Sequence, residues 1–188
     1  MSQVVAATGP TQDVACRPRA EAVGLDSPIP LSLYVHIPWC VRKCPYCDFN
    51  SHAQRGSVDE VRYVQALLAD LDQELLRQRP REVRSLFVGG GTPSLFSGNA
   101  IAQLLGGIAG RLRLSQDAEI TLEANPGTAD ARRFAAFRAA GVNRLSLGAQ
   151  SFTAASLAAL GRIHSVDDIY SSYDEARGGG FDNINLDI

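Results

Sequence analysis

Three cysteines, Cys40, Cys44 and Cys47, lie in the segment WCVRKCPYCDF with the spacing Cys-x3-Cys-x2-Cys. Cysteine thiolates are soft ligands, and three of them in one short loop can bind an iron–sulfur cluster. A cubane [4Fe–4S] cluster has one more iron than three cysteines can ligate, so one iron stays open. An open coordination position distinguishes reactive metal sites from sealed structural ones. The spacing therefore predicts a reactive [4Fe–4S] site.

Two other uses of these thiols are weighed against the cluster. Structural zinc sites draw on four Cys or His ligands, often as two Cys-x-x-Cys pairs, and the sequence has no second pair. His36 or His52, which flank the loop, could complete a zinc site. A disulfide is the weaker alternative, because an intracellular chain keeps its thiols reduced. The fourth cysteine, Cys16, lies far from the motif and is interpreted as an exposed thiol without function.

Composition and charge narrow the class of protein. The 188 residues are 45% hydrophobic and 20% charged, as expected for one globular domain with a sizeable core. The net charge of −2 argues against a general nucleic-acid binder. No apolar run is long enough to span a membrane, and no secretion signal opens the chain. We therefore expect no nucleic-acid partner, no membrane span and a cytoplasmic location.

The chain divides into a leader and a folded domain. Residues 1–29 show no helical or strand period and are predicted to be a disordered leader. From residue 30 onward, short apolar strands alternate with helical patterns, which predicts βα units and a parallel sheet. The predicted strands are 31–37, 84–89, 119–124, 143–149 and 183–188.

Capping residues and apolar spacing predict the helices between these strands. Ser57 and Glu60 form a capping-box pattern, followed by an apolar stripe. Ser165 and Asp168 open the last helix, which ends in the run 178–180, and Gly141 ends the helix before it. The stripe is Val61, Val64, Leu68, Leu71 and Leu75, and the two remaining helices are 99–112 and 129–140.

The fold class expected from this order is α/β, a partial TIM-like (βα) barrel. The chain ends within the fifth predicted strand, which would leave an apolar edge uncovered. We therefore expect residues 30–188 to form an incomplete core domain of a longer protein.

Polar residues follow the carboxyl ends of all five predicted strands. The cysteine motif follows the first, GGGTPS (89–94) the second and EANP (123–126) the third, while Gln150 and Asp187 close the last two. In barrels built from βα units the reactive residues lie at that end. The sequence thus predicts one rim that carries the chemistry.

The glycine run, one tyrosine and two histidines have local interpretations of their own. Gly89, Gly90 and Gly91 let the backbone approach a ligand, and their amide and carbonyl groups could bind an amino-acid moiety. A tight turn is the plainer alternative. Tyr46 could stack on a flat base or simply pack. His36 shares a strand face with Tyr34 by the period-two rule, and we expect a structural role for it. His164 is placed at the entry to the last helix.

These motifs resemble the radical S-adenosylmethionine (SAM) superfamily. The flanking YVHIPWC and CDFNS are similar to the branch that holds oxygen-independent coproporphyrinogen III oxidases and the HemW haem chaperones, from about Leu31 to Ile188. The resemblance implies that SAM chelates the open iron, and that an electron from the reduced cluster releases a 5′-deoxyadenosyl radical. The protein holds cofactor against cluster and excludes competing reactants.

The resemblance also implies roles for single residues. Cys40, Cys44 and Cys47 match the cluster ligands. Tyr34, Gly90 and Glu123 match contacts to the cluster-bound SAM. The positions of a second set of SAM contacts are matched by Tyr46, Gly91, Thr92, Gln150, Arg162 and Asp187. Two residues of these sets have plainer alternatives. Arg162 could form a surface ion pair, and Glu123 could cap the next loop.

One departure from the family pattern bears on function. The oxidases carry a further cysteine two positions after the last cluster ligand, and Phe49 stands there in this sequence. CDFNS is similar to the HemW group, which implies binding of haem and its delivery to apo-haemoproteins, with an electron donor for the cluster and with haem-binding residues beyond residue 188. The alternatives are a coproporphyrinogen III oxidase that forms protoporphyrinogen IX and a non-catalytic zinc-binding module. Enzymatic activity is left open.

Overall fold

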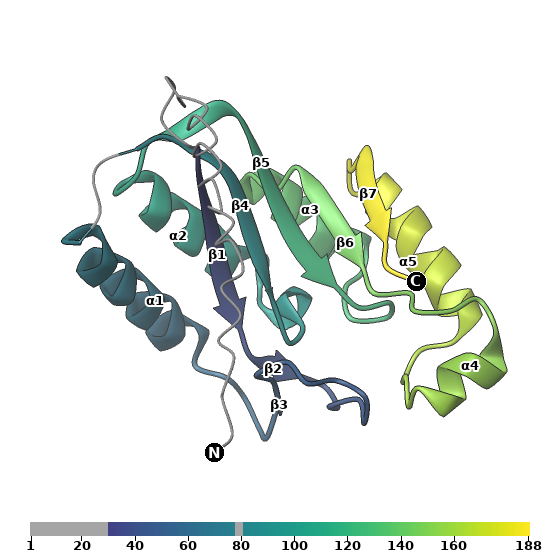
Figure 1. Ribbon diagram of the computed structural model, residues 1–188. Helices are drawn as coiled ribbons and strands as arrows, with labels where there is room; N and C mark the ends of the chain where they lie inside the picture. Colours follow the sequence, from purple (N-terminus) through teal and green to yellow (C-terminus); the bar gives the residue numbers. More distant parts are fainter. Residues whose placement is uncertain (1–29, 78–80) are drawn as a thin grey trace, which may run out of the picture.

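The computed structural model describes residues 30–77 and 81–188. The predicted leader and Cys16 lie outside the described residues. An open sheet of five parallel strands runs in the order β1-β4-β5-β6-β7 (Figure 1). These strands are β1 Leu31–Ile37, β4 Val83–Gly90, β5 Leu114–Ala124, β6 Arg144–Leu147 and β7 Asn183–Leu186. This order confirms the predicted parallel α/β fold, and the described residues do not show closure into a barrel.

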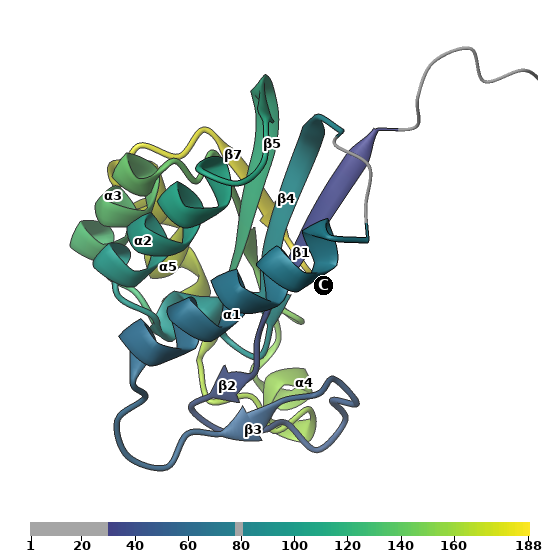
Figure 2. The same ribbon diagram turned by 90° about the vertical axis from the view of Figure 1, so that its left-hand side faces the viewer.

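Helices cover one face of this sheet. Figure 2 shows α1, α2, α3 and α5 together on one side of the strands. The short helix α4 and a two-stranded sheet lie instead near the carboxyl ends of the strands. The helices are α1 Glu60–Leu75, η1 Pro93–Leu95, α2 Gly98–Ala109, α3 Ala131–Ala140, α4 Ala154–Ala159 and α5 Val166–Gly178, and the small sheet pairs β2 Trp39–Cys40 with β3 His52–Ala53.

The hydrophobic core lies between the sheet and this helical layer. Alternate strand residues such as Leu86, Val88 and Leu122 are buried against it, as the period of two requires. The helices contribute aromatic rings, and Phe134 packs edge-on against both Phe137 and Phe181. All three rings are fully buried. The core therefore fixes the sheet from one side only.

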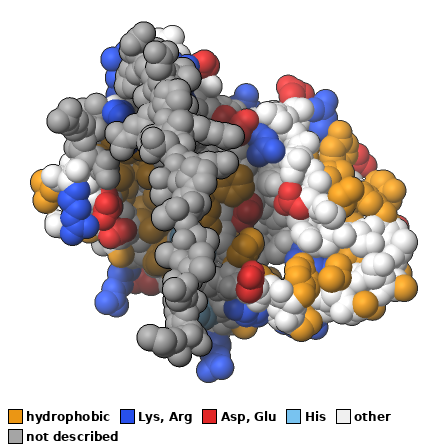
Figure 3. Space-filling model, in the orientation of Figure 1, with side chains coloured by type: hydrophobic (Ala, Val, Ile, Leu, Met, Phe, Trp, Pro, Cys, Tyr) orange, Lys and Arg blue, Asp and Glu red, His pale blue; other side chains and the backbone are white. Residues whose placement is uncertain are grey.

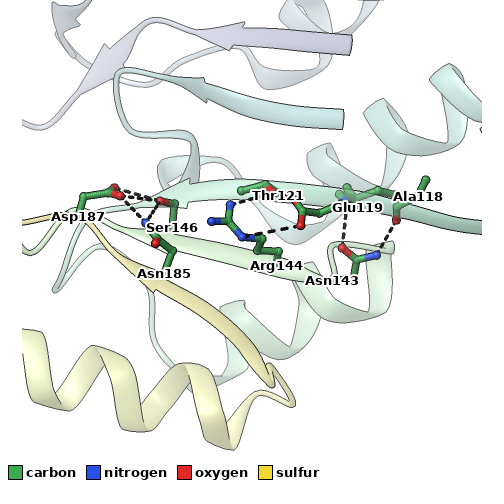
Figure 4. A network of polar contacts seen from close by, with 9 residues as sticks. Ala118, Glu119, Thr121, Asn143, Arg144, Ser146, Asn185 and Asp187 are labelled. Atoms are coloured by element: carbon green, nitrogen blue, oxygen red, sulfur yellow. Dashed lines mark hydrogen bonds and ion pairs between the residues drawn. The ribbon is translucent and has the colours of Figure 1, made fainter. Parts of the chain in front are cut away.

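The other face of the sheet carries polar and aromatic side chains. Tyr34 and Phe87, paired in register on β1 and β4, stack with ring centroids 6.2 Å apart. Toward β7 the same face carries a row of hydrogen-bonded polar residues (Figure 4). This alternation of apolar and polar residues brings the predicted rim residues to one side of the sheet.

The predicted start of α1 is wrong. Its N-cap is Asp59, whose carboxylate accepts from the Arg62 amide at 3.0 Å. Glu60 does not complete a capping box with Ser57, because its carboxylate accepts from the amide and hydroxyl of Ser97 at the start of α2. Within the predicted stripe, Val61 is 52% exposed, whereas the residues that follow it pack on the core.

The other helix signals hold with small shifts of boundary. Ser165 and Asp168 form the predicted capping box at α5. Gly141 ends α3 with a left-handed φ of 111°. The strand β5 begins at Leu114, five residues before the prediction, which missed this part because Ser115, Gln116 and Asp117 are polar. The helix α4 and the small β2–β3 sheet are not in the sequence prediction.

Two surface features complete the description. No helix among the described residues is long and apolar enough to cross a membrane. Figure 3 shows apolar side chains gathered on the side of α4, α5 and β7. There Phe152, Tyr170, Tyr173 and Leu186 line a hollow of about 440 Å3. This hollow lies where the edge strand β7 meets α5.

Candidate metal and cofactor site

A cavity of about 510 Å3 opens at the carboxyl ends of the five strands. It is lined by the three cysteines of the motif and by rim residues from every strand of the main sheet except β1. All predicted site residues lie in its wall except Tyr34 and Thr92. The structure thus brings one chemically active rim together from segments spread over the whole domain.

The cysteine loop, residues 41–51, is held by its own side chains. The Lys43 ammonium donates to the carbonyls of Phe49 at 3.0 Å and Ser51 at 3.2 Å. The Cys47 amide donates to the Cys44 carbonyl at 3.1 Å, which closes a tight turn between these two cysteines. At the ends of the loop, Cys40 pairs with Ala53 in the β2–β3 sheet. These hydrogen bonds therefore hold the loop that carries Cys44 and Cys47, and Cys40 is held in the small sheet at its start.

His36 ties the cysteine loop to β1. Its Nε2 donates to the Asn50 carbonyl at 2.8 Å, since a carbonyl can only accept. In the neutral ring Nδ1 is then an acceptor, and the Tyr34 hydroxyl donates to it at 3.0 Å. Both ring nitrogens are engaged, so the prediction of a structural histidine is confirmed, while the Tyr34 side chain stays largely exposed beside it. Neither nitrogen is free to complete a zinc site in this arrangement.

The cysteine loop also rests on the turn between α4 and α5. Arg42 donates to the Gly161 carbonyl in this turn. Gly161 has a left-handed φ of 67°, and a Cβ there would lie 2.7 Å from Pro45 Cδ. This contact explains why glycine occupies the turn, and it places Arg162 beside the cysteines.

Arg162 reaches the cysteine loop from the opposite wall of the cavity. Its Nη1 lies 3.6 Å from Cys44 Sγ, and Nη2 donates to Asn125 Oδ1 at 2.6 Å and to the Gly148 carbonyl at 2.8 Å. These partners rule out the plainer alternative of a surface ion pair. Partial burial raises the pKa of Tyr46, and the nearby Arg162 charge opposes that rise.

The glycine loop, residues 89–92, is held by backbone contacts. The Gly91 amide donates to the Ile37 carbonyl at 2.8 Å, and the Thr92 amide donates to the Trp39 carbonyl at 2.7 Å. Gly90 donates to Glu123 Oε2 at 2.9 Å. The backbone amides of Gly90 and Gly91, which were expected to serve a ligand, thus already have protein partners in this structure.

The glycines are required by close packing. A Cβ on Gly90 would lie 2.6 Å from His36 Cε1, and one on Gly91 would lie 2.6 Å from the Trp39 carbonyl oxygen. Gly90 also has a φ of 119°, which side chains rarely adopt. Both glycines line the cavity, and because they carry no side chain they leave open space beside the cysteines.

Thr92 supports the site from behind. It is buried, and its hydroxyl accepts a hydrogen bond from Asn125 Nδ2 at 2.8 Å. The Oδ1 atom of the same Asn125 side chain accepts from Arg162. Thr92 therefore helps to orient the arginine through Asn125. The structure places Thr92 in the second layer of the site, in contact with a wall residue.

Glu123 projects from β5 into the cavity. Burial raises its pKa, the Gly90 amide opposes the rise, and the Asp187 charge adds to it. Its contact with Gly90 joins β5 to the glycine loop. The alternative of a cap on the loop after β5 is wrong, since the partner lies on the neighbouring strand.

Asp187 and Gln150 close the far side of the cavity. Figure 4 shows Asp187 among hydrogen-bonded side chains of β6 and β7. Its carboxylate accepts from the Ser146 hydroxyl at 3.0 Å and from Asn185 Nδ2 at 2.5 Å. Gln150 has a left-handed φ of 68°, and its backbone N–H donates to the backbone carbonyl of Asp187 at 2.6 Å. The end of β6 is thereby tied to the end of β7.

Several wall residues were not predicted. Asn125 lies within the EANP segment, yet only its contacts with Arg162 and Thr92 reveal its part. Asn185 stands two positions before Asp187, so the period of two could have found it. The remaining unpredicted wall residues are Arg42, Phe49, Ser51, Phe87, Arg144, Ser146 and Gly148.

The donor set fits an iron–sulfur cluster. Three free cysteines, Cys40, Cys44 and Cys47, line one cavity. Within residues 30–77 and 81–188, no three Cys, His, Asp or Glu side chains come close enough to hold a single metal ion. In a cubane each thiolate binds a different iron, so its ligands need more separation than those of one ion. Gly90 and Gly91 line the same cavity without side chains, which leaves room there for a further ligand.

The comparisons with known proteins agree with this site. A model of the radical SAM superfamily matches residues 34–188. The Heme chaperone HemW of Escherichia coli is 55% identical over 159 residues, which are 85% of this chain and 42% of that protein. The mitochondrial radical S-adenosyl methionine domain-containing protein 1 of Bos taurus is 45% identical over 86% of this chain and 37% of that protein.

A solved structure extends the likeness to three dimensions. The coproporphyrinogen III oxidase HemN of Escherichia coli, a radical SAM enzyme, superposes with a TM-score of 0.74 at 32% identity. The match covers 84% of this chain and 36% of that one. The chain thus spans less than half the length of the relatives it matches. Since the family model covers most of its length, the chain belongs to the radical SAM superfamily, whose members bind a [4Fe–4S] cluster and SAM.

Proposed function

We propose that this chain is the cluster- and SAM-binding part of a HemW-type haem-handling protein. Cys40, Cys44 and Cys47 would hold the [4Fe–4S] cluster. SAM would lie against Tyr34, Gly90 and Glu123 beside it, with the remaining rim residues as further SAM contacts. Bound there, SAM and the cluster supply one-electron radical chemistry, while the side chains around them orient the cofactor and exclude water. Those remaining rim residues are Tyr46, Gly91, Gln150, Arg162 and Asp187, while buried Thr92 would act through Asn125, to which it is hydrogen-bonded.

Phe49 is the observation that carries this proposal. Its ring is 59% exposed and lines the same cavity as the three cluster thiols. The oxidase branch has a cysteine at this position, and an apolar ring cannot supply a thiol to a reacting substrate. The 55% identity to a Heme chaperone HemW, against 32% to the solved oxidase, supports the same choice.

The partners follow from this proposal. The full-length protein would bind haem and pass it to apo-haemoproteins, with haem-binding residues outside residues 30–188. An electron donor would reduce the cluster, and the work would take place in the cytoplasm. Whether radical chemistry accompanies haem delivery decides if the protein is also an enzyme.

The second candidate is an oxygen-independent coproporphyrinogen III oxidase. The TM-score of 0.74 to the solved oxidase favours it, as do the seven predicted SAM contacts that line the cavity, all but Tyr34 and Thr92. Both candidates share the cluster and SAM, so only the substrate distinguishes them.

One experiment separates the two candidates. Full-length protein, reconstituted anaerobically with iron and sulfide, is incubated with SAM, dithionite and coproporphyrinogen III. We expect no protoporphyrinogen, tight haem binding and haem transfer to an apo-acceptor. Protoporphyrinogen formed over many turnovers would contradict the proposal. The matched variant Phe49→Cys asks whether the missing thiol alone blocks the oxidase reaction.

A further inference from the structure

Arg162 makes the one charged contact to a cluster-ligand sulfur in the described part of the chain. Its Nη1 stands 3.6 Å from Cys44 Sγ, within reach of an N–H···S hydrogen bond. Cys47 Sγ has only the neutral Ser51 hydroxyl, at 3.9 Å. Cys44 and Cys47 therefore have unequal surroundings, with a guanidinium beside the first and a neutral hydroxyl beside the second.

The guanidinium is held in this position by uncharged groups. Nη2 donates to Asn125 Oδ1 and to the Gly148 carbonyl, at the ends of β5 and β6. Two acceptors on one nitrogen fix the plane of the fork and aim the other nitrogen at the sulfur. No carboxylate bonds to Arg162, so its charge is not neutralised by a direct partner in the described residues.

Gly148 makes room for this arrangement. A Cβ there would lie 2.8 Å from Asn125 Oδ1 and 3.3 Å from Arg162 Nη2. Arg162 Nε is buried without a hydrogen-bond partner, so the group is shielded from water on that side. A desolvated cation acts more strongly on a neighbouring charge than a hydrated one does.

A cation beside a cluster sulfur favours the reduced cluster. Reduction adds one negative charge, which the Arg162 charge and its N–H group stabilise more than they stabilise the oxidised form. Hydrogen bonds to the sulfurs and net charge are among the factors that set cluster potentials. Glu123 and Asp187, across the same cavity, act in the opposite direction.

We infer that Arg162 is a positioning residue that raises the reduction potential of the cluster through Cys44, independently of any contact with SAM. This inference rests on the proposed [4Fe–4S] cluster. It gives Asn125 and Gly148 a shared purpose, which is to hold the guanidinium fork against the thiolate.

The test is a redox titration of the full-length, reconstituted protein without SAM. Dithionite and mediators set the potential, and electron paramagnetic resonance reports the reduced cluster. In Arg162→Gln we expect about a tenfold lower ratio of reduced to oxidised cluster at a fixed potential, equal to about 59 mV for one electron. Arg162→Lys keeps the charge and should shift less.

Two further variants guard the interpretation. Gly148→Ala displaces the fork without changing any charge, and it should lower the potential in the same direction. Arg42→Gln removes a charge from the cysteine loop that bonds to Gly161, and we expect less than half the shift of Arg162→Gln. If Arg162→Gln loses its cluster, the titrations of Arg162→Lys and Gly148→Ala decide.

Three outcomes would overturn the inference. The first is an unchanged potential in Arg162→Gln at full iron content. The second is an equal shift in Arg42→Gln, which would mean that position does not matter. The third is an unchanged potential in both Arg162→Lys and Gly148→Ala where Arg162→Gln holds no cluster. A wild-type protein that binds no iron would instead overturn the proposed function, and this inference with it.

Discussion

The cysteine loop and the glycine loop follow neighbouring strands, yet they are held in different ways. The cysteine loop depends largely on side chains, with Lys43, His36 and Arg42 each donating to a backbone carbonyl. The glycine loop depends on backbone amides and on packing with no Cβ between the chains. Most of the cysteine loop is exposed, whereas Gly90 and Thr92 are buried.

This difference separates the ligands from the scaffold. Substitutions in the cysteine loop should change what the site binds and leave the fold intact. Substitutions in the glycine loop should strain the junction between β1 and β4, because backbone atoms cannot move aside as side chains do. The predictions below test this contrast, from the largest expected effect to the smallest.

The largest effect is expected from loss of one cluster ligand. Cys44→Ala should abolish the cluster, since two thiolates cannot anchor the cubane at this loop. Anaerobic reconstitution of wild type should give about four irons per chain, the content of one [4Fe–4S] cluster. Cys16→Ala is the control and should keep its iron. Stable zinc with no cluster in wild type would contradict the assignment.

The second-largest effect is expected in the glycine loop, and it concerns the stability of the fold. Gly91→Ala places a Cβ 2.6 Å from the Trp39 carbonyl oxygen and 2.7 Å from Pro38 C. We expect a loss of about 1–3 kcal/mol in the free energy of unfolding, measured with urea. Gly106→Ala, in α2 with nothing within 4 Å, should instead gain about 0.5–1 kcal/mol. Equal effects at the two glycines would refute the role of close packing.

A pH-dependent effect is expected at Glu123. Because burial raises its pKa in the folded state, the folded protein binds more protons than the unfolded chain from the ordinary carboxyl value of 4.5 upward. Stability is therefore lost as the pH rises through the raised pKa. Glu123→Gln does not titrate and still accepts from Gly90, so its stability relative to wild type should rise across that window.

Urea unfolding at a series of pH values measures this trend. Glu123→Ala is the companion variant, since it loses both the charge and the acceptor for the Gly90 amide. It should unfold at lower urea than Glu123→Gln at every pH. A constant difference between wild type and Glu123→Gln across the window would show that the carboxyl does not titrate with folding.

The smallest effect is expected at Lys43. Lys43→Ala removes two hydrogen bonds to loop carbonyls at an exposed position, which should cost about 1 kcal/mol or less in unfolding free energy. Iron release to a chelator should become faster, because the frame of the cysteine loop is loosened. Lys43→Arg can still donate and should release iron at nearly the wild-type rate. Identical release from all three proteins would mean that the frame does not retain the cluster.

Features with a local cause were predictable from sequence. The spacing of the cysteines, the alternation of strands and helices, and the period of two on β1 each depend on neighbours along the chain. The Ser165–Asp168 capping box and the turn at Gly141 belong to the same class. The start of α1 was not predictable, since the Glu60 carboxylate bonds to Ser97, the N-cap of α2.

Tertiary structure alone decided which side chains of the site contact one another. Arg162 and Cys44 are separated by 118 positions, and Thr92 and Asn125 by 33, yet each pair is in contact. Such partners leave no local pattern, because they depend on which strand ends become neighbours. The residue types and spacing determined by themselves that the chain would form a parallel sheet with a thiol-bearing rim. Only the packed sheet, by bringing the ends of five strands around one cavity, decided which side chain holds which.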